Sequence, residues 1–198
     1  MIISQQFLNS YAKSNNITYY AEKSIINENA FCFEESSDGS YDVFLSHSYL
    51  DKIQVLALVR LFNKHHFSVY VDWIEDNQLD RDHVNDKTAN LLRERMKQSK
   101  SLSYLTTKNI ENSKWCPWEL GYFDGLKNSK CCILPIMEYG SKFNGQEYLG
   151  LYPYLEYASH AGIDSGCDFY ICNQKRTEFM RLREWIKGST KFSQGILV

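Results

Sequence analysis

The chain has 198 residues, of which 43% are hydrophobic and 23% are charged, and its formal net charge is −2. This length suits one globular domain with a short appendage, and the slightly acidic balance excludes a general basic surface for nucleic acid. No apolar run reaches membrane-spanning length, the N-terminus has no signal-peptide pattern, and the six cysteines show no C-x-x-C spacing. We therefore expect a cytoplasmic protein with reduced thiols and with neither membrane nor nucleic acid as a partner.

The first forty residues form a segment of their own. Their apolar side chains recur at helical spacing and predict an amphipathic helix; they are Ile2, Ile3, Phe7, Leu8 and Tyr11. The flank at 33–40 is polar and is predicted to be a linker. We divide the chain into a helical extension with its linker at 1–38 and a main domain at 39–198. The helix is expected to pack on the main domain or on a neighbouring subunit.

From residue 41 onward, short apolar runs alternate with amphipathic stretches. The predicted strands are 41–46, 67–72, 102–106 and 131–136, with further strands near 154–157 and 169–172. The predicted helices are 50–64, 84–98, one that begins near 113, and a closing helix at 177–187. The polar stretch 73–83 is predicted to be a loop. This alternation predicts an α/β fold, a flavodoxin-like parallel sheet of about five strands in the order 2-1-3-4-5, with helices on both faces.

The segment at 113–120 reads Ser-Lys-Trp-Cys-Pro-Trp-Glu-Leu and opens the third of these helices. Glu119 lies inside an apolar stripe, next to Trp118 and four residues from both Trp115 and Phe123. A glutamate on the apolar side of a helix is costly unless it has a partner or a task. Two interpretations are open: Glu119 pairs with a Lys or Arg at the edge of the stripe, or it performs chemistry.

Ligands of open parallel sheets bind outside the carboxyl ends of the strands, at the point where the strand order reverses. Here that point lies between the first and third strands. The candidate site residues there are Ser46, His47, Asp72, Trp73, Trp115 and Glu119. A carboxylate, tryptophans, a hydroxyl and a helix N-terminus suit a sugar or nucleotide ligand, because they offer stacking, acceptors for ribose hydroxyls and N–H donors for phosphate.

Most of these candidates also have an ordinary structural role. Ser46 could cap the following helix, and Trp115 could be a core aromatic. Asp72 could be a turn or cap residue at the end of its strand, and His47 is expected to be structural even though its position makes it a binding candidate.

Other functions of the same scaffold need residues that are missing. The turn at 46–50 has no glycine for a dinucleotide, and no G-x-x-x-x-G-K-[ST] or G-x-S-x-G motif occurs. The acidic pair and the strand-end aspartate of a phospho-acceptor domain are absent. No H-E-x-x-H or paired-cysteine motif occurs, so no metal site is expected.

Two segments resemble one known family. Tyr41-Asp-Val-Phe-Leu-Ser-His-Ser48 is similar to the first signature box of Toll/interleukin-1 receptor (TIR) domains, and residues 113–120 are similar to the S-x-W-C-x-x-E-L segment of the enzymatic TIR domains of bacteria and plants. The resemblance covers about 41–187. It implies a flavodoxin-like fold, TIR–TIR self-association and cleavage of NAD+ between nicotinamide and ribose, with Glu119 as the catalytic residue. The loop at 73–83 departs from the family, since it lacks the usual Gly or Pro.

The chemistry of NAD+ cleavage fits a single carboxylate. Nicotinamide leaves as a neutral molecule, so the site needs no general acid and must instead stabilise an oxocarbenium-like ribose. The expected function is an NAD+ glycohydrolase or ADP-ribosyl cyclase that makes a signalling nucleotide in bacterial anti-phage defence, with NAD+ as substrate and no cofactor. The attacking group is left open: water, the adenine of the same molecule or another nucleophile. The alternatives are a non-catalytic TIR scaffold and, more distantly, a nucleoside deoxyribosyltransferase.

Overall fold

The computed structural model describes residues 3–18, 22–36, 38–76, 83–110, 113–127, 130–137, 147–159, 166–195 and 197. The strands are β1 (Tyr41–Ser46), β2 (Val69–Tyr70), β3 (Ser99–Thr106), β4 (Cys131–Pro135), β5 (Tyr154–Ala158), β6 (Asp168–Cys172), β7 (Glu178–Arg181) and β8 (Ser193–Gln194). The helices are α1 (Gln5–Ser14), α2 (Glu22–Glu34), α3 (Lys52–Lys64), α4 (Asp72–Glu75), α5 (Asp86–Lys97), α6 (Cys116–Leu126) and α7 (Leu182–Ile186). Two 3₁₀ turns, η2 (Tyr49–Asp51) and η4 (Glu147–Leu151), complete the described elements.

All described strands belong to one sheet of 8 strands in the order β2-β1-β3-β4-β5-β6-β7-β8. From β2 to β5 the pairing is parallel, so the expected order 2-1-3-4-5 is present in the first five strands. The prediction of about five strands is wrong, because β6, β7 and β8 extend the sheet in antiparallel fashion. The whole is an α/β fold with a parallel half and an antiparallel half.

The predicted closing helix at 177–187 is also wrong in its first part. Residues Glu178–Arg181 form strand β7, and only Leu182–Ile186 are helical. A tight turn explains the difference: the Asn173 side chain accepts a hydrogen bond from the Thr177 backbone N–H at 3.0 Å, and Arg176 has a φ of 56°. This turn sends the chain back along β6 as a hairpin before a helix can begin.

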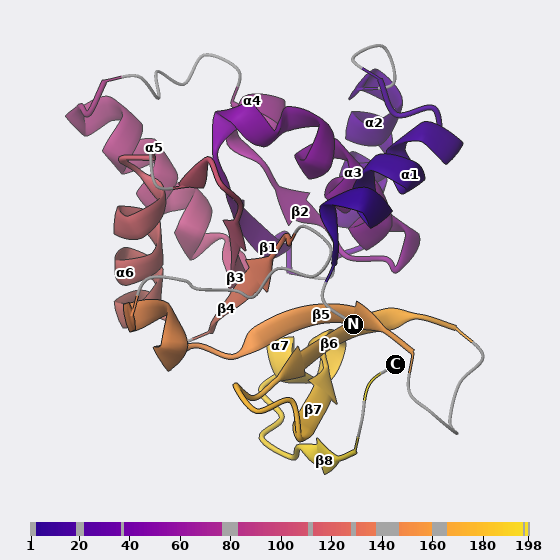
Figure 1. Ribbon diagram of the computed structural model, residues 1–198. Coiled ribbons are helices and arrows are strands. Elements are labelled where there is room, and N and C mark those ends of the chain that lie inside the picture. The colour runs from indigo at the N-terminus through magenta and orange to yellow at the C-terminus, as the bar shows by residue number, and fades with distance from the viewer. Residues whose placement is uncertain are drawn as a thin grey trace.

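Helices cover both faces of the parallel half, with α5 and α6 on one side and α1, α2 and α3 on the other (Figure 1). Alternation along β1 explains the two layers. Val43 and Leu45 join the core under α3, whereas Phe44 joins the core under α5 and α6. Ser46 lies two residues after Phe44 in the same strand, so its side chain points to the same face of the sheet, toward α6.

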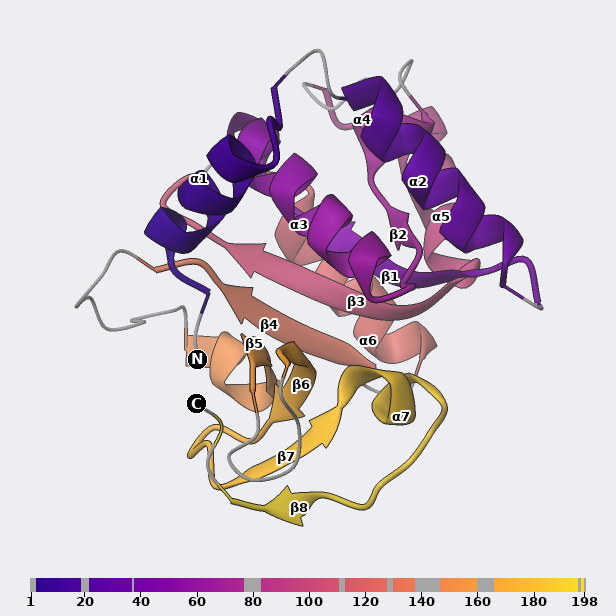
Figure 2. The same cartoon turned by 90° about the vertical axis from the view of Figure 1, so that its right-hand side faces the viewer.

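The N-terminal extension packs on the main domain, as predicted for its first helix. Helices α1 and α2 both contact α3 and lie beside it over one face of the sheet (Figure 2). Leu8 and Ile25 are fully buried in the same core as the α3 side chains. A second helix was not expected: α2 ends at Glu34, inside the predicted linker. The division between 1–38 and 39–198 stays a prediction.

The loop expected at 73–83 begins differently from the prediction. Residues Asp72–Glu75 form the short helix α4, residue 83 is an exposed bend, and residues 77–82 lie outside the described ranges. Strand β2 is also shorter than the predicted 67–72, because its pairing with β1 includes only Val69 and Tyr70. Among the described helices, none is long and apolar enough to cross a membrane.

Candidate active site

The two sequence motifs meet at the carboxyl end of β1. Ser46 is the last residue of β1, Glu119 lies in the first turns of α6, and the side chains of both are 0% exposed. The Ser46 Oγ donates a hydrogen bond to Glu119 Oε2 at 2.6 Å. A short distance of this kind is typical of a hydroxyl that donates to a carboxylate. The topology therefore brings Ser46 and Glu119 together as the strand order predicted.

The start of α6 sets the position of Glu119. The Ser113 Oγ accepts a hydrogen bond from the Cys116 backbone N–H at 3.2 Å, and Pro117 fits the first turn because its missing N–H needs no partner there. The Glu119 N–H then donates to the Trp115 carbonyl at 2.8 Å. The interpretation that Glu119 lies at the edge of the apolar stripe is wrong, because the residue is fully buried.

His47, Asp72 and Trp73 form a second polar group beside this pair. The Trp73 Nε1 donates to His47 Nε2 at 2.9 Å, and His47 Nδ1 lies 2.8 Å from the Leu45 carbonyl oxygen. Because an indole N–H can only donate, Nε2 accepts, and the proton of the neutral ring is on Nδ1. Asp72 Oδ1 lies 3.5 Å from the same Nε2. His47 and Asp72 are buried, and Trp73 is partly buried.

Cys116 connects the second group to the helix that carries Glu119. Its Sγ lies 3.2 Å from the His47 carbonyl oxygen and 3.0 Å from the Ser113 Oγ. Trp115, the remaining candidate, is 4% exposed and packs in the apolar core, with its ring centroid 5.5 Å from that of Trp118. The position of Trp115 agrees with a core role, and the functional role of each candidate stays a prediction.

Sequence reasoning missed Tyr104, which lies near Glu119, and Tyr148, the hydrogen-bonded neighbour of Tyr104. Tyr104 is the register partner of Ser46 in the β1–β3 pair and is buried on the same face. Burial raises the pKa of the Tyr104 hydroxyl, and its hydrogen-bonded neighbour Tyr148 and the charge of Glu119 raise it further. Tyr148 comes from η4 and is 39% exposed. Aligning the parallel register of the first and third strands would have found Tyr104, but no local pattern marks Tyr148.

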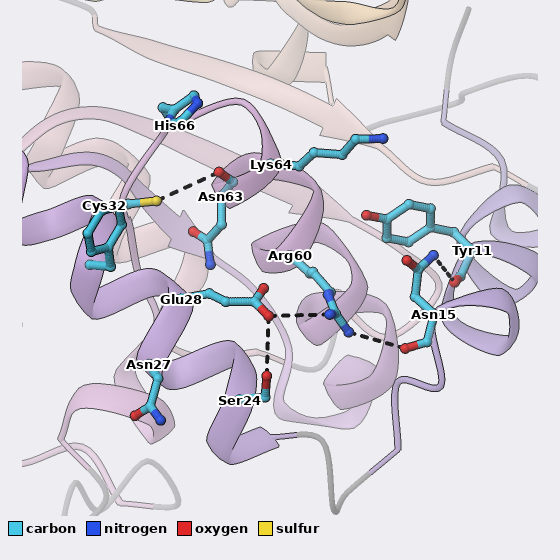
Figure 3. A pocket seen from close by; sticks show the side chains of 11 residues that line it. Tyr11, Asn15, Ser24, Asn27, Glu28, Cys32, Arg60, Asn63, Lys64 and His66 are labelled. Carbon is cyan, nitrogen blue, oxygen red and sulfur yellow. Dashed lines mark hydrogen bonds and ion pairs between the residues drawn. The ribbon is translucent and has the colours of Figure 1, made fainter.

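Two hollows lie away from this site. One, of about 640 Å³, opens between α1, α2 and α3 around the Glu28–Arg60 ion pair (Figure 3). The other, of about 720 Å³, is lined by Asp42, Lys100 and Arg183 among others. Neither is lined by any of the six predicted site residues. Within the described part of the chain, no cluster of His, Cys, Asp or Glu could hold a metal ion.

Comparison with known proteins places the chain in a family. No family model matches the chain, but two known proteins are similar to it. The chain is 47% identical over 149 residues to the probable 3′ cyclic ADP-D-ribose synthase ThsB′ of Bacillus cereus (strain MSX-D12), an alignment that covers 74% of this chain and 76% of that protein. It is 38% identical over 94 residues to the putative cyclic ADP-D-ribose synthase TIR2 of Cytobacillus dafuensis, covering 47% of this chain and 25% of that protein. With this identity over most of its length, the chain belongs to the TIR-like family that contains these cyclic ADP-D-ribose synthases.

Proposed function

We propose that this protein is an NAD+-cleaving cyclase: it breaks the bond between nicotinamide and ribose and closes the remaining ADP-ribose into a ring. The single observation that carries the proposal is the fully buried contact between Ser46 and Glu119 at the meeting point of the two motifs. The relatives named as cyclic ADP-D-ribose synthases support the same substrate and product class.

The proposed mechanism assigns one main task to Glu119. When the C–N bond breaks, its electron pair goes to the nicotinamide ring, which leaves uncharged, and positive charge develops on the ribose. The Glu119 carboxylate stabilises that charge, and its effect is large because the group is shielded from water. The Ser46 hydroxyl holds the carboxylate in place.

The other candidates form the wall against which the substrate lies. Trp73 is partly buried and offers an aromatic face, while Asp72 and His47 offer polar atoms for the ribose or the amide. Tyr148 is the hydrogen-bonded neighbour of Tyr104 and is accessible enough to contact a ligand. Cyclisation then needs a nucleophile from the same ADP-ribose, and exclusion of water favours it over hydrolysis.

The proposal extends to the protein's setting. NAD+ is the substrate and no cofactor takes part, and the cyclic product acts as a signalling nucleotide in the cytoplasm during bacterial anti-phage defence.

TIR–TIR self-association, with the segment 73–83 as one contact surface, completes the site. We therefore expect the rate per molecule to rise with protein concentration or with a crowding agent. Rates strictly proportional to protein concentration over a wide range would show a self-sufficient monomer.

Incubation with NAD+ and mass spectrometry of the products tests the proposal. A cyclase releases nicotinamide together with a product one water lighter than ADP-ribose, whereas a glycohydrolase releases ADP-ribose itself. A scaffold that acts only through TIR–TIR contacts releases no nicotinamide at any protein concentration, and that result would overturn the proposed function.

A further inference from the structure

Helix α2 of the N-terminal extension contributes a side chain to the edge of the sheet. Asn29 is 0% exposed, its Nδ2 donates to the Val69 carbonyl at 2.8 Å, and its Oδ1 accepts from the Val69 N–H at 2.8 Å. Strand β2 is the terminal strand at this end of the sheet. The Asn29 amide therefore satisfies one donor and one acceptor that a neighbouring strand would otherwise satisfy.

The same amide reaches the helix that carries two of the candidate site residues. Asn29 Nδ2 lies 3.1 Å from Glu75 Oε1, and Glu75 is the last residue of α4. Burial raises the pKa of the Glu75 carboxyl, and hydrogen bonds from Tyr41 and Asn29 oppose that shift. Asn29 thus connects Val69 of β2, the strand before α4, to Glu75 at the end of α4. Asp72 and Trp73 lie between these two residues in the chain.

A second contact from α2 converges on Trp73. Glu22 Oε2 lies 3.1 Å from Lys52 Nζ, and that ammonium lies 4.5 Å from the centroid of the Trp73 ring. Trp73 in turn donates to His47, which follows Ser46 directly in the chain. Two independent sets of contacts therefore connect the N-terminal extension to the wall of the candidate active site.

We propose that Asn29 is a positioning residue for NAD+ binding, acting through Val69 and Glu75 to hold α4 and its Asp72 and Trp73 in register with His47. The inference rests on the proposed function. It assigns a catalytic purpose to the N-terminal extension, which lies outside the two TIR-like motifs.

The experiment compares Asn29→Ala with Asn27→Ala in the full chain. Both substitutions remove an asparagine side chain from α2, but Asn27 is exposed and lines the hollow between α1, α2 and α3. Activity is measured well below the unfolding temperature, together with amide hydrogen exchange at Val69. We expect the Asn29 variant to exchange the Val69 amide about tenfold faster and to raise KM for NAD+ on the order of tenfold, with a smaller change in kcat. Asn27→Ala should change neither.

A second variant separates positioning from loss of fold. Glu75→Ala removes one of the Asn29 contacts but leaves both hydrogen bonds to Val69 intact. It should raise KM by a smaller factor without exposing the Val69 amide. An Asn29→Ala protein with faster Val69 exchange but unchanged KM would overturn this inference while leaving the proposed function intact. A wild-type protein that releases no nicotinamide would overturn the proposed function, and NAD+ positioning with it.

Discussion

The parallel half of the sheet and its junction with the antiparallel half each bury a glutamate, and the two carboxylates have different partners. Glu119 in the parallel half is 0% exposed and accepts a hydrogen bond from the Ser46 hydroxyl at 2.6 Å. Glu156 on β5, which pairs in parallel with β4 and antiparallel with β6, is 2% exposed and lies 2.6 Å from the guanidinium of Arg176. The guanidinium stacks over Tyr154, with 5.4 Å between its carbon and the ring centroid.

In the proposed function, this difference separates a stabilising carboxylate from a reactive one. A guanidinium neutralises the charge of its partner, so the Glu156–Arg176 pair joins a strand to a hairpin turn and is complete without a ligand. A hydroxyl orients a carboxylate and stabilises it but contributes no positive charge of its own. In the proposed mechanism, the negative charge of Glu119 acts on a cationic sugar. Burial alone does not separate the two carboxylates, because both are buried, whereas the partners that the structure gives them differ.

Glu119→Gln should produce the largest effect on activity. The carboxamide keeps the shape of the side chain and removes its charge, so the fold should persist. Loss of one preorganised electrostatic group in a water-poor site costs about 3–4 kcal/mol in the barrier, or a hundredfold to a thousandfold in rate. The rate of nicotinamide release, monitored by chromatography, measures this loss.

Glu156→Gln is the matched control, because the same substitution removes the charge of the other buried carboxylate. It should leave the rate per folded molecule unchanged. Full activity in a folded Glu119→Gln protein would contradict the assignment of Glu119 and the comparison between the two residues.

Arg176→Met should affect stability and leave catalysis intact. The substitution keeps the length of the side chain but leaves Glu156 without its guanidinium. Breaking a fully buried pair costs roughly 3–5 kcal/mol, and we expect about 2 kcal/mol here because the Arg176 side chain is 43% exposed. Urea unfolding measures the change, and adding Glu156→Gln in the same chain should recover part of it. A drop in the rate per folded molecule would show that the antiparallel half takes part in catalysis.

Much of the parallel half could be predicted from the sequence, because strong local patterns mark each element. The apolar runs before residue 136 predicted β1, β3 and β4 to within a few residues, and parallel topology then predicted the meeting of Ser46 and Glu119. The antiparallel half was harder. Phe179, Met180, Leu182 and Trp185 recur at a spacing that also suits a helix, and only the turn near Asn173 decides that Phe179 and Met180 belong to a strand.

The depth of the site and its support could not be predicted, since they depend on contacts between distant residues. The local sequence around Glu119 left open whether it lies at an edge or in the core. Asn29 occupies the middle of a helix, where an asparagine is ordinarily solvent-facing, and its partner Val69 is 40 residues away. Tyr148 meets Tyr104 only because η4 returns to the sheet.

Ser46→Ala should sharpen the contrast between a hydroxyl partner and an ionic one. It removes the donor to Glu119 but leaves the carboxylate charge, so activity should fall less than in Glu119→Gln. Hydrogen bonds to charged groups contribute roughly 1.5–3 kcal/mol, and a loss of about tenfold in kcat corresponds to the lower end of that range. Steady-state kinetics with NAD+ measures it. A loss as large as that of Glu119→Gln would mean that Ser46 contacts the substrate rather than only orienting the carboxylate.

The smallest effect is expected at Asp76, a carboxylate of the parallel half with an ionic partner. Its two carboxylate oxygens lie 2.8 and 2.9 Å from the Arg95 guanidinium, and the Tyr70 hydroxyl donates to it at 2.9 Å. Burial alone would raise the pKa of Asp76, but the hydrogen bonds from Arg95 and Tyr70 outweigh it and hold the pKa below its ordinary value.

The sign of the pH dependence follows from that direction. A folded-state pKa below the unfolded value, about 3.9 for an aspartate, adds stability above that value and loses it as the pH falls through the folded-state pKa. Asp76→Asn should cost about 1 kcal/mol or less at neutral pH, since the pair is partly exposed, and should weaken the fall in melting temperature below about pH 4. The rate per folded molecule should not change if an ionic partner marks a stabilising carboxylate in either half of the sheet. Thermal unfolding at a series of pH values, alongside the NAD+ assay, checks both parts. A variant with the wild-type acid response would show that the Asp76–Arg95 pair adds nothing to the fold, and a variant with reduced turnover would show that an ionic partner does not exclude a role in the site.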